Sequence, residues 1–432
     1  MEFLNRQFKL EERGTTVRQE IIAGIATFLT MAYIIIVNPL ILKDAGMDFG
    51  AVFTATILAA VIGTTIMGLW ANWPVAMAPG MGLNAFFTYG VVLGMGHTWQ
   101  VALGAVFCSG ILFLILSFTK VRQWIIEAMP KSLRFGVGAG IGFFLAIIGL
   151  KNAGIIVDSP ATLVTVGDLT SSTAALAILG FIVMMVLDAR KVPGAIIIGI
   201  LVVTIIGLFT GDATWGGGDW LPPSLAPTFF ALDLATVFEL GLIVVVLTFL
   251  FVDFFDTAGT LTSVANMAGK VDEDGKVQDI GRAVISDGAA TTAGALLGTS
   301  STTSYIESGA GIKEGGRTGL TAITTAVLFL LCLFLAPLAK TIPGWATAPA
   351  LVFVAIFFAK NLKDLDWEDM SDYGPAILAA VVMPFTFSIA YGIAMGFTAY
   401  VVIKALTGKA GEVHVAVWLL AVVSVLFFIK DF

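Results

Sequence analysis

The 432-residue sequence has few charged side chains and few of the residues on which soluble enzymes depend. Only 12% of its residues are Asp, Glu, Lys or Arg, whereas 58% are hydrophobic, and its mean hydropathy is +0.97. It contains only two cysteines and two histidines. The low charge and the high hydropathy exclude an ordinary soluble domain and indicate a chain that crosses a membrane many times.

The scarcity of cysteine and histidine limits the chemistry of the chain. Cys108 and Cys332 both lie in apolar runs, so neither a disulfide framework nor a thiolate metal site is expected. His97 and His414 lie far apart, near the ends of apolar segments, which leaves no recognisable metal site or nucleophile with its base. We therefore expect no bound metal, no cofactor and no enzymatic activity.

Long apolar runs begin at Ile21 and continue almost to the end of the chain. Since about 20 apolar residues cross a bilayer, we predict an all-α polytopic membrane protein with fourteen transmembrane segments, followed by a last apolar stretch at 413–430. The predicted segments are residues 21–42, 51–71, 74–93, 99–119, 134–157, 173–188, 192–210, 238–267, 281–297, 299–315, 318–340, 347–359, 374–385 and 387–406.

The basic residues give this arrangement an orientation. If the N-terminus is cytoplasmic, all 23 Lys and Arg residues fall on the cytoplasmic side except Lys43, Lys151 and Lys340, which are external, and Lys430, which is unassigned. The positive-inside rule supports the segment count and the orientation together. The stretch 211–237 is then an external linker between two halves of seven segments each. Because seven is odd, the two halves are inverted repeats, which are common in transporters.

Two segments depart from a regular helix pattern at equivalent places in the two halves. Residues 73–87 contain Pro74 and Pro79, which disfavour helix before them, and residues 299–316 open with a run of Thr and Ser before Glu307. Each pattern predicts extended chain followed by a half-helix, whose free N–H groups would face the middle of the membrane. The alternative is a pair of kinked helices packed through small residues.

Three carboxylates lie inside the predicted segments: Asp253 and Asp256, one helical turn apart, and Glu307. A charge at bilayer depth costs roughly 2.5 to 3.5 kcal/mol, so such residues usually line a site or carry protons. Together with the amide of Asn84 they would match a flat heterocycle that bears N–H and C=O groups. All three carboxylates are candidates for proton coupling. The alternative is that hydroxyls and helix ends satisfy these carboxylates, which would then only hold the bundle together.

Six stretches spread over nearly the whole chain carry a resemblance to a known family. They are FKLEERGTTVRQEIIAGIATFLTMAYIIIVNP, PVAMAPGMGLNAFF, GLKNAGIIV, FFDTAGTL, GTSSTTSYIESGAGIKEGGRTGLTA and MPFTFSIAYGIAMGF. Several of these stretches are loose individually, but together and in this order they are specific. The sequence resembles the AzgA-like purine permeases of the nucleobase and ascorbate transporter superfamily.

The resemblance implies a core domain of segments one to four and eight to eleven, a gate domain of the other segments, and a short strand in segments three and ten. It also implies that Asp256 and Glu307 contact a purine between the half-helices, and that Asp253 and Asn84 match positions linked to recognition. The expected division is 1–20 cytoplasmic leader, 21–130 first core part, 131–210 first gate part, 211–237 external linker, 238–341 second core part, 342–408 second gate part and 409–432 C-terminal apolar segment.

These observations lead to one functional hypothesis and three rivals. We predict uptake of adenine, hypoxanthine or guanine by proton symport across the inner membrane, with the core moving against the gate, a homodimer formed through the gate, and no nucleic-acid partner. The rivals are a transporter of xanthine or uracil, an inorganic anion channel or exchanger of the same architecture, and a membrane enzyme. Acids in the site disfavour an anion, and the missing nucleophile disfavours an enzyme. The three purines differ only along one ring edge, so the sequence does not rank them.

Overall fold

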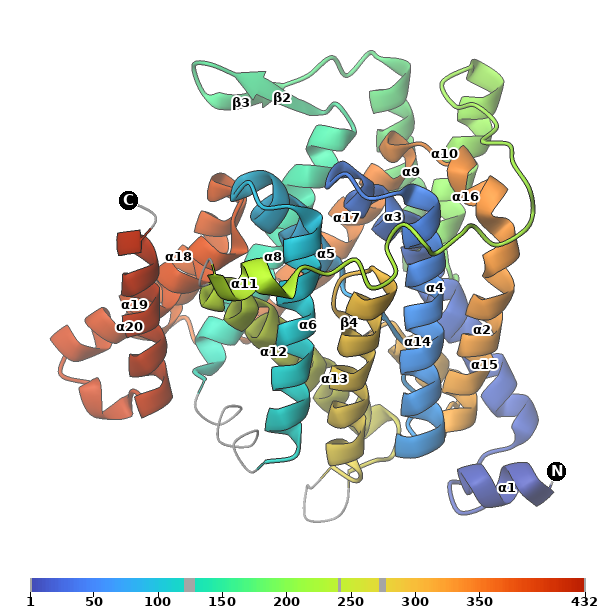
Figure 1. The fold of residues 1–432 in the computed structure, drawn as a ribbon. Helices are drawn as coiled ribbons and strands as arrows, with labels where there is room; N and C mark the ends of the chain where they lie inside the picture. The colour runs from blue at the N-terminus through green and yellow to red at the C-terminus, as the bar shows by residue number, and fades with distance from the viewer. Residues whose placement is uncertain (1, 120–128, 240–241, 272–276, 431–432) are drawn as a thin grey trace.

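Helices make up most of the computed structural model, which describes residues 2–119, 129–239, 242–271 and 277–430 (Figure 1). Within these ranges nine helical stretches are long and apolar enough to cross a membrane, and shorter apolar helices lie at Met81–Gly94, Ala195–Thr210 and Val415–Val425. The chain is therefore a multi-pass membrane protein. The arrangement of fourteen segments in two inverted halves stays a prediction. Lys120, Arg122 and Lys276, which the orientation assigns to the cytoplasm, lie outside the described residues.

The first part of the chain contains the helices and strand of the predicted core. These are α1 (Glu2–Phe8), α2 (Val17–Met31), α3 (Ile34–Asp44), α4 (Phe49–Ile66), the π-helical η1 (Met67–Ala71), β1 (Met77–Pro79), α5 (Met81–Ala85), the π-helical η2 (Phe86–Gly94) and α6 (Trp99–Ser117). The predicted gate then begins with α8 (Lys131–Asn152), β2 (Ile156–Ser159), β3 (Leu163–Val166), α9 (Ser172–Ala189) and α10 (Ala195–Thr210).

The second part of the chain, like the first, contains one segment in which a short strand leads into a short helix, and continuous helices lie on both sides of it. It contains α11 (Leu234–Glu239), α12 (Ile243–Met267), α13 (Ile280–Leu297), β4 (Thr302–Ser304), α14 (Ser308–Lys313), α15 (Gly319–Leu331), η3 (Cys332–Leu335) and α16 (Ala336–Thr341). The remaining elements are α17 (Gly344–Ala359), η4 (Lys360–Asp364), α18 (Met370–Thr386), α19 (Ile389–Leu406), η5 (Ala410–Glu412) and α20 (Val415–Lys430).

Side-chain caps fix where many of the helices begin. The first-turn N–H groups of a helix have no partner within the helix, and Ser, Thr or Asp at the preceding position can accept from one of them. The side chains of Thr16, Asp48, Thr98, Ser171 and Thr318 do so at the starts of α2, α4, α6, α9 and α15. The polar residues between the apolar runs therefore end one segment and start the next.

One predicted helix is shorter than expected. The segment predicted at 134–157 ends as α8 at Asn152, because the chain turns at Gly154, whose φ is +69°. The β-branched residues that follow form the antiparallel hairpin β2–β3, which lies at the end of the bundle opposite α1 (Figure 1). The expectation of an all-α chain is wrong at this hairpin.

The short strands expected in the two broken segments are present. Strand β1 pairs antiparallel with β4, with Ala78 opposite Thr303. The pairing continues past both strands, since Gly80 N–H donates to Ser301 O at 2.9 Å and Tyr305 N–H donates to Ala76 O at 3.0 Å. A two-stranded sheet of this size is marginal by itself, so the surrounding helices must hold it. The pairing joins the two broken segments side by side.

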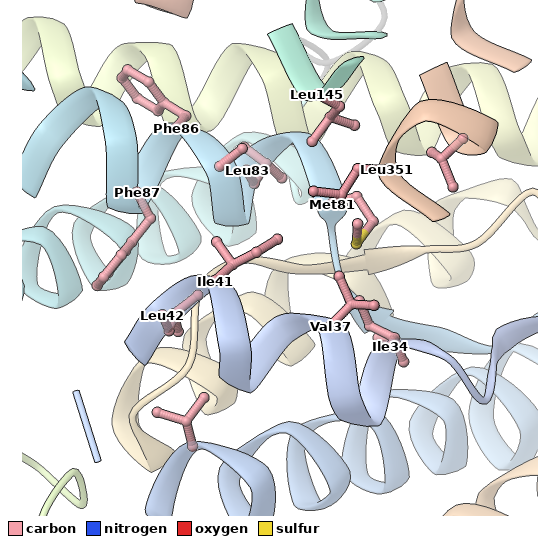
Figure 2. Close-up of a cluster of buried hydrophobic side chains, with 14 of the residues drawn as sticks. Ile34, Val37, Ile41, Leu42, Met81, Leu83, Phe86, Phe87, Leu145 and Leu351 are labelled. Carbon is pink, nitrogen blue, oxygen red and sulfur yellow. The ribbon is translucent and has the colours of Figure 1, made fainter. Parts of the chain in front are cut away.

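The half-helix α5 packs between elements of the predicted core and gate. Figure 2 shows Met81 and Leu83 of α5 near Val37 of α3 on one side, and near Leu145 of α8 and Leu351 of α17 on the other. All five side chains are buried. The contact between predicted core and gate is therefore apolar here, and it places the start of α5 at their boundary.

The last apolar stretch forms α20, which lies beside α19 (Figure 1). Lys404 of α19 is buried, and its Nζ pairs with Glu412 at 2.8 Å and Asp372 at 3.0 Å. A buried cluster joins the two helices to the start of α8. Its members are Met129, Leu133, Phe397, Tyr400, Val401, Val413, Val417 and Ala421.

Glycine lets α8 approach α18 closely, which gives a first prediction. A Cβ at Gly136 would lie 2.6 Å from Ala376 Cα, whereas a Cβ at Gly138 would meet only Asn361 Nδ2, at 3.3 Å. We expect Gly136→Ala to destabilise the protein by about 1 to 3 kcal/mol through overpacking. The control Gly138→Ala should be neutral or stabilising, because Ala favours helix over Gly. Thermal unfolding midpoints in detergent measure both, and an unchanged midpoint in Gly136→Ala would contradict this packing.

Candidate functional site

The two broken segments bring two helix starts to the same place. Strand β1 leads through Gly80 into α5, and β4 leads through Tyr305 into α14. The Tyr305 hydroxyl donates to Pro79 O at 2.6 Å, so the two connections are tied to each other. At the start of α14 the N–H groups of Ser308, Gly309 and Ala310 already donate to the carbonyls of residues 305–307. The start of α5 therefore supplies the unpaired N–H donors and a positive dipole end beside the strands.

Glu307 lies at the start of α14, half-buried, and is held by the α2–α3 junction. The Tyr33 hydroxyl donates to Glu307 Oε1 at 2.9 Å, and the Thr30 hydroxyl donates to the Glu307 backbone carbonyl at 3.4 Å. An ionised carboxylate can accept about four hydrogen bonds. Tyr33 therefore orients the group and leaves it able to accept from a ligand.

Asp256 is half-buried on α12 and points toward the same region. It interacts electrostatically with Glu307, Tyr33 and Tyr305. In the described part of the chain its carboxylate has no hydrogen-bond partner. The structure thus brings Asp256 and Glu307, which lie 51 positions apart in the sequence, into one site with free acceptor capacity.

Asp253 lies one turn before Asp256 but faces α13. It is buried, and its Oδ2 accepts from the Thr291 hydroxyl at 2.7 Å. The same hydroxyl oxygen lies 3.1 Å from Thr302 O of β4. Asp253 therefore lies behind the strand pair, one step away from the helix starts.

Asn84 is bonded to the protein itself. It is buried in α5, its Oδ1 accepts from the Ser300 hydroxyl, and its Nδ2 donates to Pro79 O at 3.4 Å. The amide ties the first half-helix to the chain that enters β4. In this conformation its position favours a supporting role over direct contact with a ligand.

Asp287 is a buried carboxylate that the sequence analysis missed. It lies on α13, and its Oδ1 accepts from the Ser304 N–H and the Ser304 hydroxyl, both at 2.8 Å. The criterion that selected the other acids, a carboxylate inside a predicted segment, would have found it, because Asp287 lies within 281–297. Tyr33 was also missed, and its contact with Glu307 bridges 274 positions, a pairing that no local pattern signals.

Glu20 shows what a purely structural buried carboxylate looks like in this protein. It is fully buried near the start of α2 and accepts from the Arg317 N–H, from the N–H and hydroxyl of Thr318, and from the N–H and hydroxyl of Thr321. Its two oxygens secure the start of α15. Asp256 has no such set of donors among the described residues, which sets it apart from Glu20.

Within the described ranges no cluster of three or more His, Cys, Asp or Glu side chains is arranged to hold a metal ion. The polar groups that meet at the helix starts are carboxylates, tyrosine hydroxyls and backbone N–H groups. Such a set binds a solute through hydrogen bonds, and it is enclosed by helices that span a membrane. The fold and the site together define a membrane transport protein.

The comparison with known proteins gives the family. The model of the Permease family matches residues 18–395, and the chain belongs to that family. Adenine permease AdeP of Escherichia coli is 47% identical over 423 residues, which cover 98% of this chain and 95% of AdeP. Guanine/hypoxanthine permease PbuG of Bacillus subtilis is 46% identical over 440 residues, which cover 98% of each chain. The predicted resemblance to AzgA-like purine permeases is confirmed.

A solved structure shares the fold at low identity. The transmembrane domain of the cyanobacterial bicarbonate transporter BicA superposes with a TM-score of 0.65 and 16% sequence identity, over 88% of this chain and 97% of that one. This likeness concerns the fold alone, since one fold hosts transporters of different solutes.

Proposed function

We propose that this protein takes up purine nucleobases (adenine, hypoxanthine or guanine) by proton symport through the inner membrane, with its N-terminus in the cytoplasm. The relatives named as adenine and guanine/hypoxanthine permeases, which match almost the whole chain, support the substrate class. The inward direction of transport, the coupling to a proton and the movement of the core domain against the gate domain are part of the proposal.

One observation carries the proposal: Asp256 and Glu307 meet beside the two helix starts with free acceptor capacity. Purines present N–H donors along their ring edges, and carboxylates are the strongest acceptors among protein side chains. Backbone N–H groups at the start of α5 complement these acceptors, because they can donate to the ring carbonyl or to the unprotonated ring nitrogens. Inorganic anions would instead meet two carboxylates, which would repel them.

The proposed movement is that of the core domain, 21–130 and 238–341, against the gate domain, 131–210 and 342–408. Asp256, Glu307 and both helix starts belong to the core, so they would travel together with the bound base. Where α5 meets α8 and α17 the contact is apolar (Figure 2). Apolar side chains impose no fixed register of hydrogen bonds across the boundary, which suits sliding of one domain along the other.

A transported proton supplies the driving force. A neutral purine gains nothing from the membrane potential, whereas one accompanying proton contributes about 2.3 kcal/mol per 100 mV. The proton must also favour one conformation over the other, because a ligand shifts an equilibrium only by its difference in affinity for the two states. A carboxyl group in the core satisfies both requirements, and the candidates from the sequence are Asp253, Asp256 and Glu307.

A homodimer formed through the gate domain completes the proposal. The lipid bilayer surrounds the dimer, and neither a nucleic acid nor a cofactor takes part. A fixed pair of gate domains would give each core a stationary partner to move against.

Uptake into proteoliposomes tests this function. With an acidic exterior, radiolabelled hypoxanthine and adenine should accumulate above their external concentration, and a protonophore should abolish the accumulation. Liposomes without protein are the control. Uptake that is unchanged by the pH gradient and by the protonophore would refute symport. Sulfate or bicarbonate flux without purine flux would favour an anion exchanger, and chemical conversion of the purine would indicate an enzyme.

A further inference from the structure

Two buried carboxyl groups meet behind the strand pair. Asp253 Oδ2 is bonded to Thr291, and Asp287 Oδ1 is bonded to Ser304. The other oxygen of each group, Asp253 Oδ1 and Asp287 Oδ2, is buried and has no donor. The two side chains lie within hydrogen-bonding reach of each other. Two buried carboxyl groups, each with one oxygen that lacks a hydrogen bond, therefore lie next to each other between α12 and α13.

No cation compensates this pair in the part of the chain that the structure describes. Asp256 is the other acid near both groups. Arg282 is the basic residue of α13, five positions before Asp287, and no ion pair joins it to either carboxylate. The neighbouring elements α4, α6 and β4 contribute no Asp, Glu, Lys, Arg or His, and the titratable side chain among them is Cys108. The helices α14 and α19 also pack against α12 and carry Lys313 and Lys404, but Lys404 pairs with Asp372 and Glu412, and among the described residues no ion pair joins either lysine to Asp253 or Asp287.

Two adjacent carboxylates without a cation cannot both remain ionised at low dielectric, and such pairs share one proton. A proton between Asp253 Oδ1 and Asp287 Oδ2 gives each oxygen the partner that it lacks. Removal of that proton leaves two negative charges in contact inside the protein, an arrangement that the surrounding helices must relieve by moving apart.

We propose that Asp253 and Asp287 together hold the transported proton, apart from Asp256 and Glu307, which contact the base. This inference rests on the proposed symport. An O–H bond forms when the pair takes a proton from external water, and the same bond breaks when the proton leaves to the cytoplasm. On the external side an O–H bond of hydronium breaks as the carboxyl O–H bond forms, and on the cytoplasmic side a water molecule accepts the released proton.

The strand β4 connects the pair to the substrate site. Asp287 holds Ser304 through its backbone N–H and its hydroxyl, and Glu307 follows only three positions later. Thr257 of α12 also meets Thr303 of β4, with 2.9 Å between the two hydroxyl oxygens. Separation of α12 from α13 after proton loss would therefore displace β4 and with it the start of α14. The occupancy of the proton site and the geometry of the base site are coupled by this strand.

Asp287→Asn tests the assignment. Its amide N–H can donate to Asp253 Oδ1 in place of the shared proton, so the variant should fold and bind hypoxanthine with a pair that keeps permanently the charge of its protonated form. We expect exchange of labelled for unlabelled hypoxanthine across the proteoliposome membrane to continue. Accumulation driven by a pH gradient should be lost, and so should the proton movement that accompanies each purine. Asp253→Asn should behave in the same way.

Thr292→Val is the matched control, because Thr292 lies on the same helix and bonds only to its own backbone at Gly288. It should accumulate hypoxanthine as the wild type does. Accumulation by Asp287→Asn at the wild-type level would overturn the assignment, as would accumulation driven by a sodium gradient alone. If the wild type itself ignores the pH gradient, the proposed symport fails instead.

A spectroscopic readout tests the shared proton without a transport assay. Infrared spectra of the wild-type protein at neutral pH should contain a protonated-carboxyl band that is lost when Asp253 or Asp287 becomes an amide. Absence of such a band in the wild type would show two ionised carboxylates and would also overturn the proposal.

Discussion

Glu307→Gln is expected to weaken hypoxanthine binding about 100-fold, the loss of roughly 3 kcal/mol that a hydrogen bond to a charged acceptor carries. The Tyr33 hydroxyl donates to Glu307 Oε1. In the variant the amide oxygen would keep that bond, and the amide N–H₂ would then face the N–H of the base. The amide N–H₂ of the variant and the N–H of the base would both be donors, whereas in the wild type the Glu307 carboxylate accepts from the base. Calorimetric titration of the detergent-solubilised protein measures the change.

Two further variants separate this effect from misfolding and from a change in net charge. Glu314→Gln makes the same chemical change at an exposed position just after the end of α14, and it should leave binding unaltered. Tyr33→Phe removes only the orienting bond and should weaken binding by about 10-fold or less. Wild-type affinity in Glu307→Gln would remove Glu307 from the site.

The broken segments were predictable because their signals are local. Pro74 and Pro79 restrict the backbone before and at their own positions, and Gly80 follows immediately, so an extended chain before a short helix is encoded within a few residues. The observed β1 and α5 follow this pattern. Caps such as Asp48 are equally local. By contrast, the end of α8 at Asn152 is not signalled in this way, because Ile155, Ile156 and Val157 continue the apolar run, and a short apolar run does not by itself distinguish a helix from a strand.

The site itself depends on contacts that no window of sequence contains. Asn84 offers an amide, but only the fold shows that Ser300 and Pro79 occupy it. Asp253 and Asp256 are one turn apart on a helix, yet one faces α13 and the other faces the helix starts. Asp287 lies within the predicted segment 281–297, so its carboxylate was within reach of a local criterion, but its position beside Asp253 of α12 depends on the fold.

The carboxylates occupy two layers with different surroundings. In the first layer, Asp256 and Glu307 lie half-buried beside tyrosine hydroxyls and helix starts. In the second, Asp253 and Asp287 are fully buried among hydroxyls of α13 and β4. Half-buried acceptors suit a ligand that enters from water, whereas a closed pair with two facing oxygens suits a proton. The two layers are joined by β4, since Asp287 holds Ser304 and Glu307 follows three positions later.

Asp256→Asn is expected to discriminate among the purines. Guanine carries two adjacent donors, N1–H and the exocyclic amino group, which a carboxylate can accept together, whereas hypoxanthine offers N1–H alone on that edge. We expect guanine affinity to fall about 100-fold and hypoxanthine affinity about 10-fold, since each lost charged bond is worth roughly 1.5 to 3 kcal/mol. Competition by the three unlabelled bases against radiolabelled hypoxanthine measures the ranking.

Asp256→Asn should not destabilise the protein, so a loss of affinity would report on binding. Asp256 has no hydrogen-bond partner among the described residues, and an amide of the same size removes a charge from a half-buried position. The unfolding temperature of Asp256→Asn should therefore equal or exceed that of the wild type. Asp188→Asn, the same substitution at the exposed end of α9, should change neither affinity nor ranking. Equal losses for guanine and hypoxanthine would mean that Asp256 does not accept from the edge on which the two bases differ.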